Sequence, residues 1–304
     1  MIRAHDIVNN TCTNLILGTA QFDGPYGISN PANILSKETI TSILKLASQS
    51  GITTLDTAVG YGNTETVIGA NNQTDWRIIT KLPSKPAHTK QLADWVSTTV
   101  ERSLSRLNVE ILEGVLFHHP TDLLTSHGEL LYRAVHDLKT HGLLHKIGFS
   151  CYEPTECENL IRAFDFDIIQ APINIFDQRM INAIKRDPIR FESIEIHARS
   201  IFLQGVLLQE IMFQQATFPR WHRLWDDYHT WLSQTGLTAL DACIGFIQAQ
   251  DCIDKYIVGI DNICQLQEIV AIISHGLSIK VPACLNIIDP MLLNPTNWLV
   301  GDCA

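Results

Sequence analysis

The chain has 304 residues, of which 45% are hydrophobic and 18% are charged. This composition provides enough apolar side chains for a large core and excludes an intrinsically disordered protein. The formal net charge of -10 at pH 7 argues against a nucleic-acid-binding protein, because such a surface needs clustered basic residues.

No segment predicts an association with a membrane. The sequence contains no basic run that would attach to a lipid surface. It also lacks a stretch close to the roughly 20 apolar residues that span a bilayer. Residues 1–6 lack the basic start of a signal peptide, so we expect a cytoplasmic protein.

The cysteines are spread among apolar stretches and predict reduced, mostly buried thiols. They are Cys12, Cys151, Cys157, Cys243, Cys252, Cys264, Cys284 and Cys303. None forms a CxxC pair, so we favour free thiols over disulfides. Cys and His ligands at metal spacing are also absent, and no metal site is predicted.

The first elements of the chain read as a buried strand, a helix and a second buried strand. Residues 15–18 (LILG) form a short apolar run, and Ser36 is the expected N-cap of the helix that follows. Its buried face has the spacing i, i+3, i+4 and i+7, at Ile40, Ile43, Leu44 and Ala47. Gly51 stands where a helix end favours a left-handed residue, and residues 52–55 supply the second strand.

The same alternation continues along the chain. A helix is expected over residues 90–107, and it would bury Leu92, Trp95, Val96 and Leu104. Another helix is expected over residues 129–141, before Gly142. Further strands are expected at residues 76–80, 112–117, 146–149, 168–171, 194–196 and 256–258. Short strands joined by long crossovers pair in parallel, and eight such units fit an α/β protein with one (β/α)8 TIM barrel over residues 1–304. An open doubly wound sheet is the alternative, although its Gly-x-Gly-x-x-Gly loop is missing after the first strand.

Two segments lie outside this repeat. Residues 206–236 read as an inserted loop and helix after the seventh predicted strand, and residues 280–304 form a C-terminal tail that contains Trp298. The inserted segment carries several aromatic residues and could act as a lid over the substrate or cover the side of the barrel as core.

Polar residues at the carboxyl ends of the predicted strands are the candidates for catalysis, because the active sites of such barrels lie at this face. They are Asp56, Lys81, His118, Ser150, Gln170 and Ser200, with Tyr61 in the loop after Asp56. Taken singly, Asp56 could be a turn former, Tyr61 a packed loop aromatic and Lys81 a surface charge. Their common placement favours an active site.

A Tyr, a Lys, an Asp and a His that meet in one pocket suit the reduction of a carbonyl group. Hydride transfer to carbon leaves negative charge on oxygen, so a proton has to be supplied, and Tyr61 can donate it. Lys81 can lower the pKa of Tyr61 from its ordinary value of about 10, and Asp56 can hold Lys81 in place. His118 can donate a hydrogen bond to the substrate oxygen. His119 then points elsewhere, because adjacent strand residues face opposite sides.

Segments at the ends of six predicted strands resemble the aldo-keto reductase family. Residues 55–65 (LDTAVGYGNTE) resemble its signature, and shorter matches are found at residues 79–81 (ITK), 116–118 (LFH), 147–150 (IGFS), 169–170 (IQ) and 257–259 (IVG). The resemblance implies an enzyme that uses NADP(H) or NAD(H) to reduce an aldehyde or ketone. Tyr61 would be the general acid/base, Lys81 and Asp56 would tune it, and His118 would orient the carbonyl.

The resemblance also implies where the cofactor binds. Ser150 and Gln170 would bind the nicotinamide amide, next to Asp56. The remaining cofactor contacts would be Gly18, Thr19, Ala20 and Gln21 at the ring, Ser200, Leu203 and Gly205 at the pyrophosphate, and Gly259, Gln265 and Glu268 at the adenosine.

Residues 177–179 (DQR) resemble a run found in a bacterial subset of the family that is often linked with carbohydrate metabolism. A sugar or sugar derivative is therefore our first expectation for the substrate. A structural role explains the run better, with Asp177 as a cap and Arg179 paired with a carboxylate.

The loop after the last predicted strand leaves the choice of cofactor open. NADP-preferring members usually carry basic residues here, but residues 259–268 (GIDNICQLQE) contain no Lys or Arg. Asp261 would repel a 2'-phosphate and could instead hydrogen-bond a ribose hydroxyl. We expect NADH to be used at least as well as NADPH.

Two other classes of function remain open. The chain could be a cofactor-binding regulatory protein with little turnover, or a barrel enzyme of another kind, such as an aldolase that forms a Schiff base on Lys81. A metal-dependent hydrolase would need more clustered carboxylates and histidines than the strand ends provide.

Overall fold

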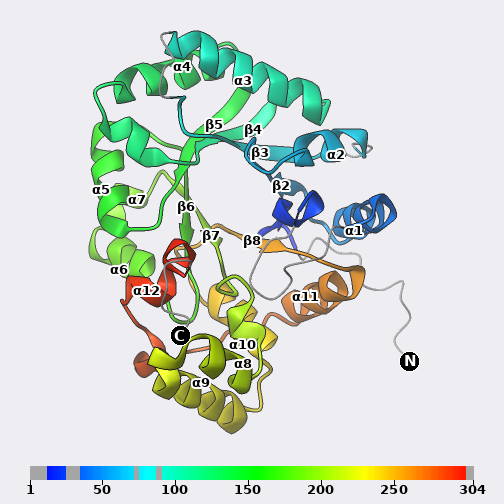
Figure 1. Ribbon diagram of the computed structural model, residues 1–304, viewed down its shortest axis with the longest axis vertical. Helices are drawn as coiled ribbons and strands as arrows, with labels where there is room; N and C mark the ends of the chain where they lie inside the picture. Colours follow the sequence, from blue (N-terminus) through cyan, green and yellow to red (C-terminus); the bar gives the residue numbers. More distant parts are fainter. Residues whose placement is uncertain (1–11, 25–34, 72–74, 87–90, 299–304) are drawn as a thin grey trace.

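Eight parallel strands close into a barrel, with each strand paired to its neighbours in chain order (Figure 1). This computed structural model describes residues 12–24, 35–71, 75–86 and 91–298. The strands are β1 (Leu15–Gly18), β2 (Thr54–Asp56), β3 (Arg77–Leu82), β4 (Leu112–Phe117), β5 (Leu144–Ser150), β6 (Ile168–Pro172), β7 (Glu195–Arg199) and β8 (Lys255–Gly259). The expected (β/α)8 barrel is confirmed, and pairing of β1 with β8 rules out the open sheet.

Helices surround the barrel and bury the outer faces of the strands (Figure 1). They are α1 (Lys37–Gln49), α2 (Thr64–Ala70), α3 (Leu92–Leu107), α4 (Gly128–Thr140), α5 (Pro154–Ala163), α6 (Arg179–Arg186), α7 (Pro188–Phe191), α8 (Ile211–Thr217), α9 (His222–Thr235), α10 (Ala239–Gln248), α11 (Ile263–His275) and α12 (Pro290–Leu293). Because both faces of the sheet are covered, most strands contain short runs of buried apolar residues. Inside the barrel, Ile16, Ile79, Leu116 and Ile168 form a small separate cluster.

The local signals that predicted helix α1 are realised in the structure. The Ser36 hydroxyl accepts a hydrogen bond from the backbone N–H of Thr39 at 3.1 Å, and Gly51 adopts a φ of 82° after the helix. The buried residues of the helix are those predicted: Ile40, Ile43, Leu44 and Ala47. Helix α3 likewise buries Leu92, Val96 and Leu104, whereas Trp95 is only half-buried.

Strand β7 differs most from the sequence-based expectation. We expected it to end at Ile196, but it continues to Arg199, which pairs with Pro172 of β6. The extension adds a polar residue to the carboxyl end of the barrel. His197, on the same strand, is buried and lies 3.2 Å from the Glu195 carboxylate, so its ring is packed inside the fold.

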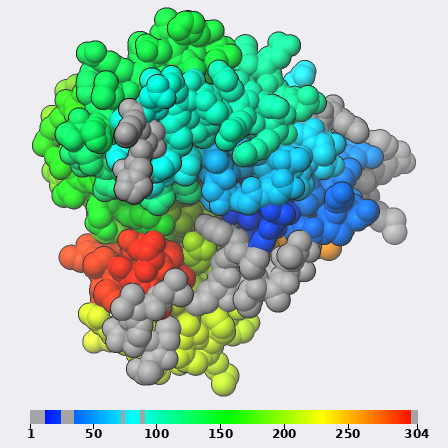
Figure 2. Space-filling model, turned by 45° about the horizontal axis from the view of Figure 1, so that its top comes forward, coloured from blue at the N-terminus to red at the C-terminus, as the bar shows by residue number. Residues whose placement is uncertain are grey.

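The segment of residues 206–236 contains α8, α9 and two short 3-10 helices, Val206–Leu208 and Pro219–Trp221. Trp225 and Tyr228 of α9 are fully buried, and Phe218 packs against Trp298 of the tail with a 5.0 Å ring separation. Figure 2 shows the C-terminal residues in red against this segment in yellow-green. The segment thus adds core of its own beside the barrel.

The cysteines of the described residues differ in burial. Four of the seven described cysteines are buried, whereas Cys264 and Cys284 are exposed, and no disulfide joins two described cysteines. Cys303 lies outside the described residues.

No helix in the described ranges is long and apolar enough to cross a membrane. The same part of the chain holds no group of three or more His, Cys, Asp or Glu side chains that could bind a metal.

Candidate active site

A cavity of about 930 Å³ opens at the carboxyl ends of the strands. Its walls come from the β1 and β2 ends, the loop after β7, and helices α9, α10 and α11. Its volume is at the upper end of the range for ligand pockets, and this face carries the active sites of (β/α)8 barrels. Asp56 and Tyr61 are among the lining residues.

Asp56 and Lys81 form a buried ion pair beneath the cavity. The Lys81 ammonium lies 2.5 Å from Oδ1 of Asp56 and donates to the Thr57 carbonyl at 2.9 Å. The side chains of Lys81 and Asp56 are only 1% and 5% exposed. Oδ2 of Asp56 accepts a hydrogen bond from the Gln170 amide at 2.8 Å. The structure therefore brings together three predicted site residues from β2, β3 and β6, and the charge of Lys81 is balanced within the fold.

Tyr61 lies above this pair, in the loop between β2 and α2. Its ring centroid is 5.3 Å from the Lys81 ammonium. Burial, and then the Asp56 charge, raise the pKa of Tyr61 above its ordinary value, although Arg199 acts in the opposite direction. The sequence-based expectation was a lowered pKa caused by Lys81. It is not met because burial of the phenol, followed by the Asp56 charge, outweighs the cations nearby.

His118 follows β4 and approaches Tyr61 edge to face, with the two ring centroids 5.9 Å apart. Burial, assisted by the charges of Lys81, His119 and Arg199, lowers the pKa of His118 to about 3. The imidazole is therefore neutral near pH 7 and keeps one N–H donor. His119 is exposed, as expected for a residue of the following loop.

Ser150 and Gln170 are neighbours at the ends of β5 and β6. Gln170 lines the cavity, but Ser150 is buried behind it, and its hydroxyl accepts a hydrogen bond from Nε of Arg199 at 3.1 Å. The Arg199 guanidinium also donates to the Cys151 carbonyl at 3.0 Å and lies over the Tyr152 ring at 4.1 Å. The Arg199 side chain thus lies between Ser150 and the cavity.

The predicted cofactor-binding residues fall mostly on the cavity wall. Those that line it are Gly18, Thr19, Ala20, Gln21, Asp56, Gln170, Ser200, Gly205, Gly259, Gln265 and Glu268. Leu203 does not line the cavity, because its side chain is fully buried in the hydrophobic core. The Thr19 hydroxyl donates to the Asp56 carbonyl at 2.9 Å. Gln21 lies against Gly259, where any side chain would collide with it, and Oε1 of Gln21 finds no hydrogen-bond partner among the described residues.

The loop after β7 has an unusual backbone. Ser200, Leu203 and Gln204 all have positive φ angles of 55°, 47° and 57°. This left-handed region costs free energy for residues other than glycine, so surrounding contacts have to hold it. One such contact is a hydrogen bond from the Asn174 side-chain amide to the Ser200 carbonyl at 3.2 Å.

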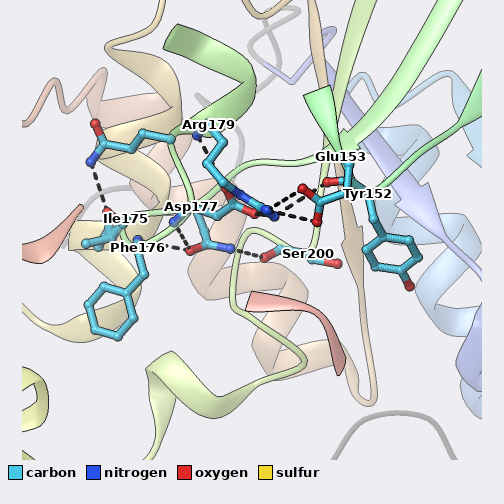
Figure 3. A network of polar contacts seen from close by, with 9 residues as sticks. Tyr152, Glu153, Ile175, Phe176, Asp177, Arg179 and Ser200 are labelled. Atoms are coloured by element: carbon cyan, nitrogen blue, oxygen red, sulfur yellow. Dashed lines mark hydrogen bonds and ion pairs between the residues drawn. The ribbon is translucent and has the colours of Figure 1, made fainter. Parts of the chain in front are cut away.

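A polar network anchors Asn174 and the loop after β5 (Figure 3). The carbonyl oxygen of the Asn174 side chain accepts from the backbone N–H groups of Phe176 and Asp177, both at 3.0 Å. Arg179 then joins the buried Asp177 carboxylate at 2.8 Å and the half-exposed Glu153 carboxylate at 2.8 Å. The ion-pairing role expected for Arg179 is seen, and it ties the β6 end to the loop that carries Tyr152 (Figure 3).

Several lining residues were missed by the sequence analysis. Arg199 was not singled out, although its neighbour Ser200 was. Helix α9 contributes His229, Leu232 and Ser233 to the cavity. The segment of residues 206–236 therefore forms a wall of the cavity as well as core. No local pattern marks these positions, since a helical face gives the same periodicity against a core or a cavity.

The charges around the cavity are unevenly distributed. The lining carboxylates are Asp56, Glu210, Asp261 and Glu268, and the far end is built by Asp261, Gln265 and Glu268. Among the lining residues that the structure describes, Arg199 is the one arginine and there is no lysine. The far end therefore lacks a cation for a phosphate.

Comparison with known proteins points to one family. A family model described as the aldo/keto reductase family matches residues 14–289. A Pseudomonas aeruginosa protein, provisionally named as an aldo-keto reductase, is 23% identical, with 87% of this chain and 91% of that chain covered and a TM-score of 0.64. An aldo-keto reductase from Bacillus halodurans in its holo form is 16% identical, with coverages of 89% and 94% and a TM-score of 0.68. At these identities the two structures show the shared fold. No curated protein matches the chain.

Proposed function

The chain belongs to the aldo/keto reductase family, whose members generally use NAD(P)H, and we propose that it reduces an aldehyde or ketone to the alcohol with Tyr61 as the proton donor. The observation that carries this proposal is the position of Tyr61. Its ring lies 5.3 Å from the Lys81 ammonium, at the wall of a cavity that the Asp56–Lys81 pair underlies.

The reduced nicotinamide, when bound in the cavity, would supply the hydride. The residues of the chain supply the rest of the chemistry. Tyr61 is protonated at neutral pH, as a phenol with a pKa of about 10 or higher has to be, so it can protonate the oxygen as negative charge develops there. His118 is neutral and can donate a hydrogen bond to the same oxygen.

The lining residues fit a dinucleotide held along the cavity. Oε1 of Gln21, which has no partner among the described residues, can accept a hydrogen bond from the cofactor. Ser200 and Gly205 belong to the loop after β7, where both have positive φ angles, and both line the cavity. Gln265 and Glu268 stand at the far end.

The same far end favours NADH over NADPH in this proposal. Asp261 and Glu268 would repel the doubly charged 2'-phosphate of NADPH, and no lining cation compensates for them there. The charges do not oppose NADH, which carries free hydroxyl groups at this ribose. For the substrate, a sugar or sugar derivative remains our choice of carbonyl compound, in a cavity that His229 and Ser233 border with polar groups.

One titration tests the proposal. NADH and NADPH are added separately to the purified protein, and quenching of its six tryptophans is followed. We expect saturable binding of NADH at submillimolar concentration, and turnover when aldehydes and ketones are then screened. Absence of binding by either nucleotide would contradict both the reductase and a cofactor-binding regulatory protein. Tight binding without turnover of any carbonyl in the screen would favour the regulatory protein.

A further inference from the structure

We propose that Arg199 makes the site discriminate between the two redox states of the cofactor, so that the neutral reduced nicotinamide binds more tightly than the cationic oxidised one. This inference rests on the proposed function. It concerns a residue to which neither the sequence signals nor the catalytic scheme above assigns a role.

The location of Arg199 follows from its contacts. Nε, Nη1 and Nη2 of its guanidinium donate to Ser150, Ser200 and the Cys151 carbonyl at 3.1, 3.3 and 3.0 Å. The group lines the same cavity as Tyr61. Its charge also acts on both Tyr61 and His118, lowering the pKa of each. Arg199 therefore lies next to the place where the carbonyl is reduced.

The nicotinamide ring has to occupy that place as well. A hydride moves directly from the ring to the carbonyl carbon, and the oxygen of this carbonyl is bound by Tyr61. The reacting atoms have to lie about 3–3.5 Å apart, so the ring is held within a few ångströms of Tyr61. Arg199 borders this position from the side of β5 and β7.

Arg199 differs from Arg179, another half-buried arginine nearby, in having no carboxylate ion-pair partner among the described residues. Arg179 is paired with both Asp177 and Glu153. The oxygens that hold Arg199 are two hydroxyls and a carbonyl, all neutral, and no carboxylate of the described residues lies within ion-pair distance of it. Its positive charge thus borders the cavity without an ion-pair partner among the described residues, although the Glu156 carboxylate lies near enough to interact with it.

A cation at this position affects the two forms of the cofactor unequally. Both forms carry the same pyrophosphate, so any attraction between Arg199 and this group is common to them. Only the oxidised ring carries a positive charge, which Arg199 repels. The reduced form is favoured, and the reduction potential of the bound couple is raised above that of the free couple.

The test compares the dissociation constants of NADH and NAD⁺, measured by tryptophan quenching for each variant. We expect the natural protein to bind NADH more tightly than NAD⁺. Arg199→Gln, which keeps hydrogen-bond donors but removes the charge, should reduce the ratio of the two constants by at least about tenfold, since two unit charges about 6 Å apart at an effective dielectric constant of about 20 interact more strongly than a tenfold change requires. A tenfold change corresponds to about 30 mV for this two-electron couple.

Two control variants complete the design. Arg199→Lys retains the charge and should keep most of the ratio. Arg133→Gln removes a charge at a residue that is 71% exposed on α4 and should leave the ratio unchanged. A ratio is insensitive to partial misfolding, because both constants come from the same preparation.

The outcomes separate this inference from the proposed function. Equal affinities of the natural protein for NADH and NAD⁺ would overturn the inference. So would equal weakening of both ligands in Arg199→Gln, which would assign Arg199 to the pyrophosphate. Failure of the natural protein to bind any nicotinamide nucleotide would instead overturn the proposed function.

Discussion

The side-chain amide of Gln170 donates a hydrogen bond to Oδ2 of Asp56 over 2.8 Å, although the two residues lie 114 positions apart in the chain. The other carboxylate oxygen of Asp56 is bound by Lys81 at 2.5 Å. Both oxygens of a buried carboxylate are thus satisfied by side chains from two other strands. The pair and its amide hold the floor of the candidate active site in one arrangement.

Breaking this pair from one side should be costly. Lys81→Met leaves Asp56 charged and buried, and we expect a loss of about 3–5 kcal/mol in the free energy of unfolding. The double variant Asp56→Asn, Lys81→Met removes both charges and should lose less than the sum of the two single variants. Urea unfolding measures all four proteins. Strictly additive losses would show that the two charges do not depend on each other.

Removal of the Tyr61 hydroxyl should separate binding from chemistry. Tyr61→Phe keeps the ring but loses the proton donor, so turnover should fall by at least about 100-fold. NADH affinity should change by less than about twofold, because the lost hydroxyl acts on the substrate. Steady-state rates and the fluorescence titration give the two quantities. Turnover close to that of the natural protein would remove Tyr61 from its assigned role.

The two carboxylates that bind Arg179 should contribute unequally to stability. The Asp177 side chain is 1% exposed, whereas that of Glu153 is 43% exposed. Asp177→Asn should therefore cost about 2 kcal/mol of unfolding free energy, and Glu153→Gln less than about 1 kcal/mol. Thermal or urea unfolding of this matched pair provides the comparison. Equal losses would mean that burial does not determine the strength of these contacts.

The partly buried imidazole of His118 should make stability depend on pH. Its pKa is about 3 in the folded protein against 6.5 for the unfolded chain. Between pH 3 and pH 6.5 the unfolded state binds more protons than the folded state. The stabilisation that comes from the neutral imidazole is therefore complete above pH 6.5 and is lost as the pH falls. Relative to His118→Asn, the natural protein should lose roughly 1 kcal/mol between pH 6.5 and 5.5. Parallel pH profiles of the two proteins would contradict a lowered pKa.

The charge at Asp261 should influence the choice of cofactor. Asp261→Asn removes an anion from the far end of the cavity while retaining the size of the side chain, so NADPH affinity should rise by several-fold. NADH affinity should change little, since it has no 2'-phosphate. Fluorescence titrations of the variant provide both values. An unchanged NADPH affinity would indicate that the phosphate does not lie near this residue.

The barrel could be predicted from the sequence because each βα unit carries its own signals. The apolar run of β1, the Ser36 cap and the left-handed Gly51 are local features, and burial of both sheet faces gives most strands short apolar runs. Asp56, Tyr61, Lys81 and His118 could be grouped since parallel strands bring their carboxyl ends to one side. Their mutual distances then follow from the closed barrel.

The electrostatics of the site could not be obtained in the same way. The sequence indicated that Lys81 would lower the pKa of Tyr61, but it contains no information on how completely Asp56 balances Lys81. Arg199 was missed for a related reason. Its position depends on hydrogen bonds to three neutral groups and on a strand that runs three residues further than its apolar run suggests.

The seam of the barrel joins strands from nearly opposite ends of the chain, since Leu15 of β1 pairs with Tyr256 of β8. During synthesis, β1 cannot pair with β8, its second neighbour, until residue 259 has left the ribosome. Until then the sheet is open, with unpaired backbone groups at both edges. Incomplete chains would expose these edges to one another, so the route to the native barrel is most vulnerable to aggregation just before its last strand arrives.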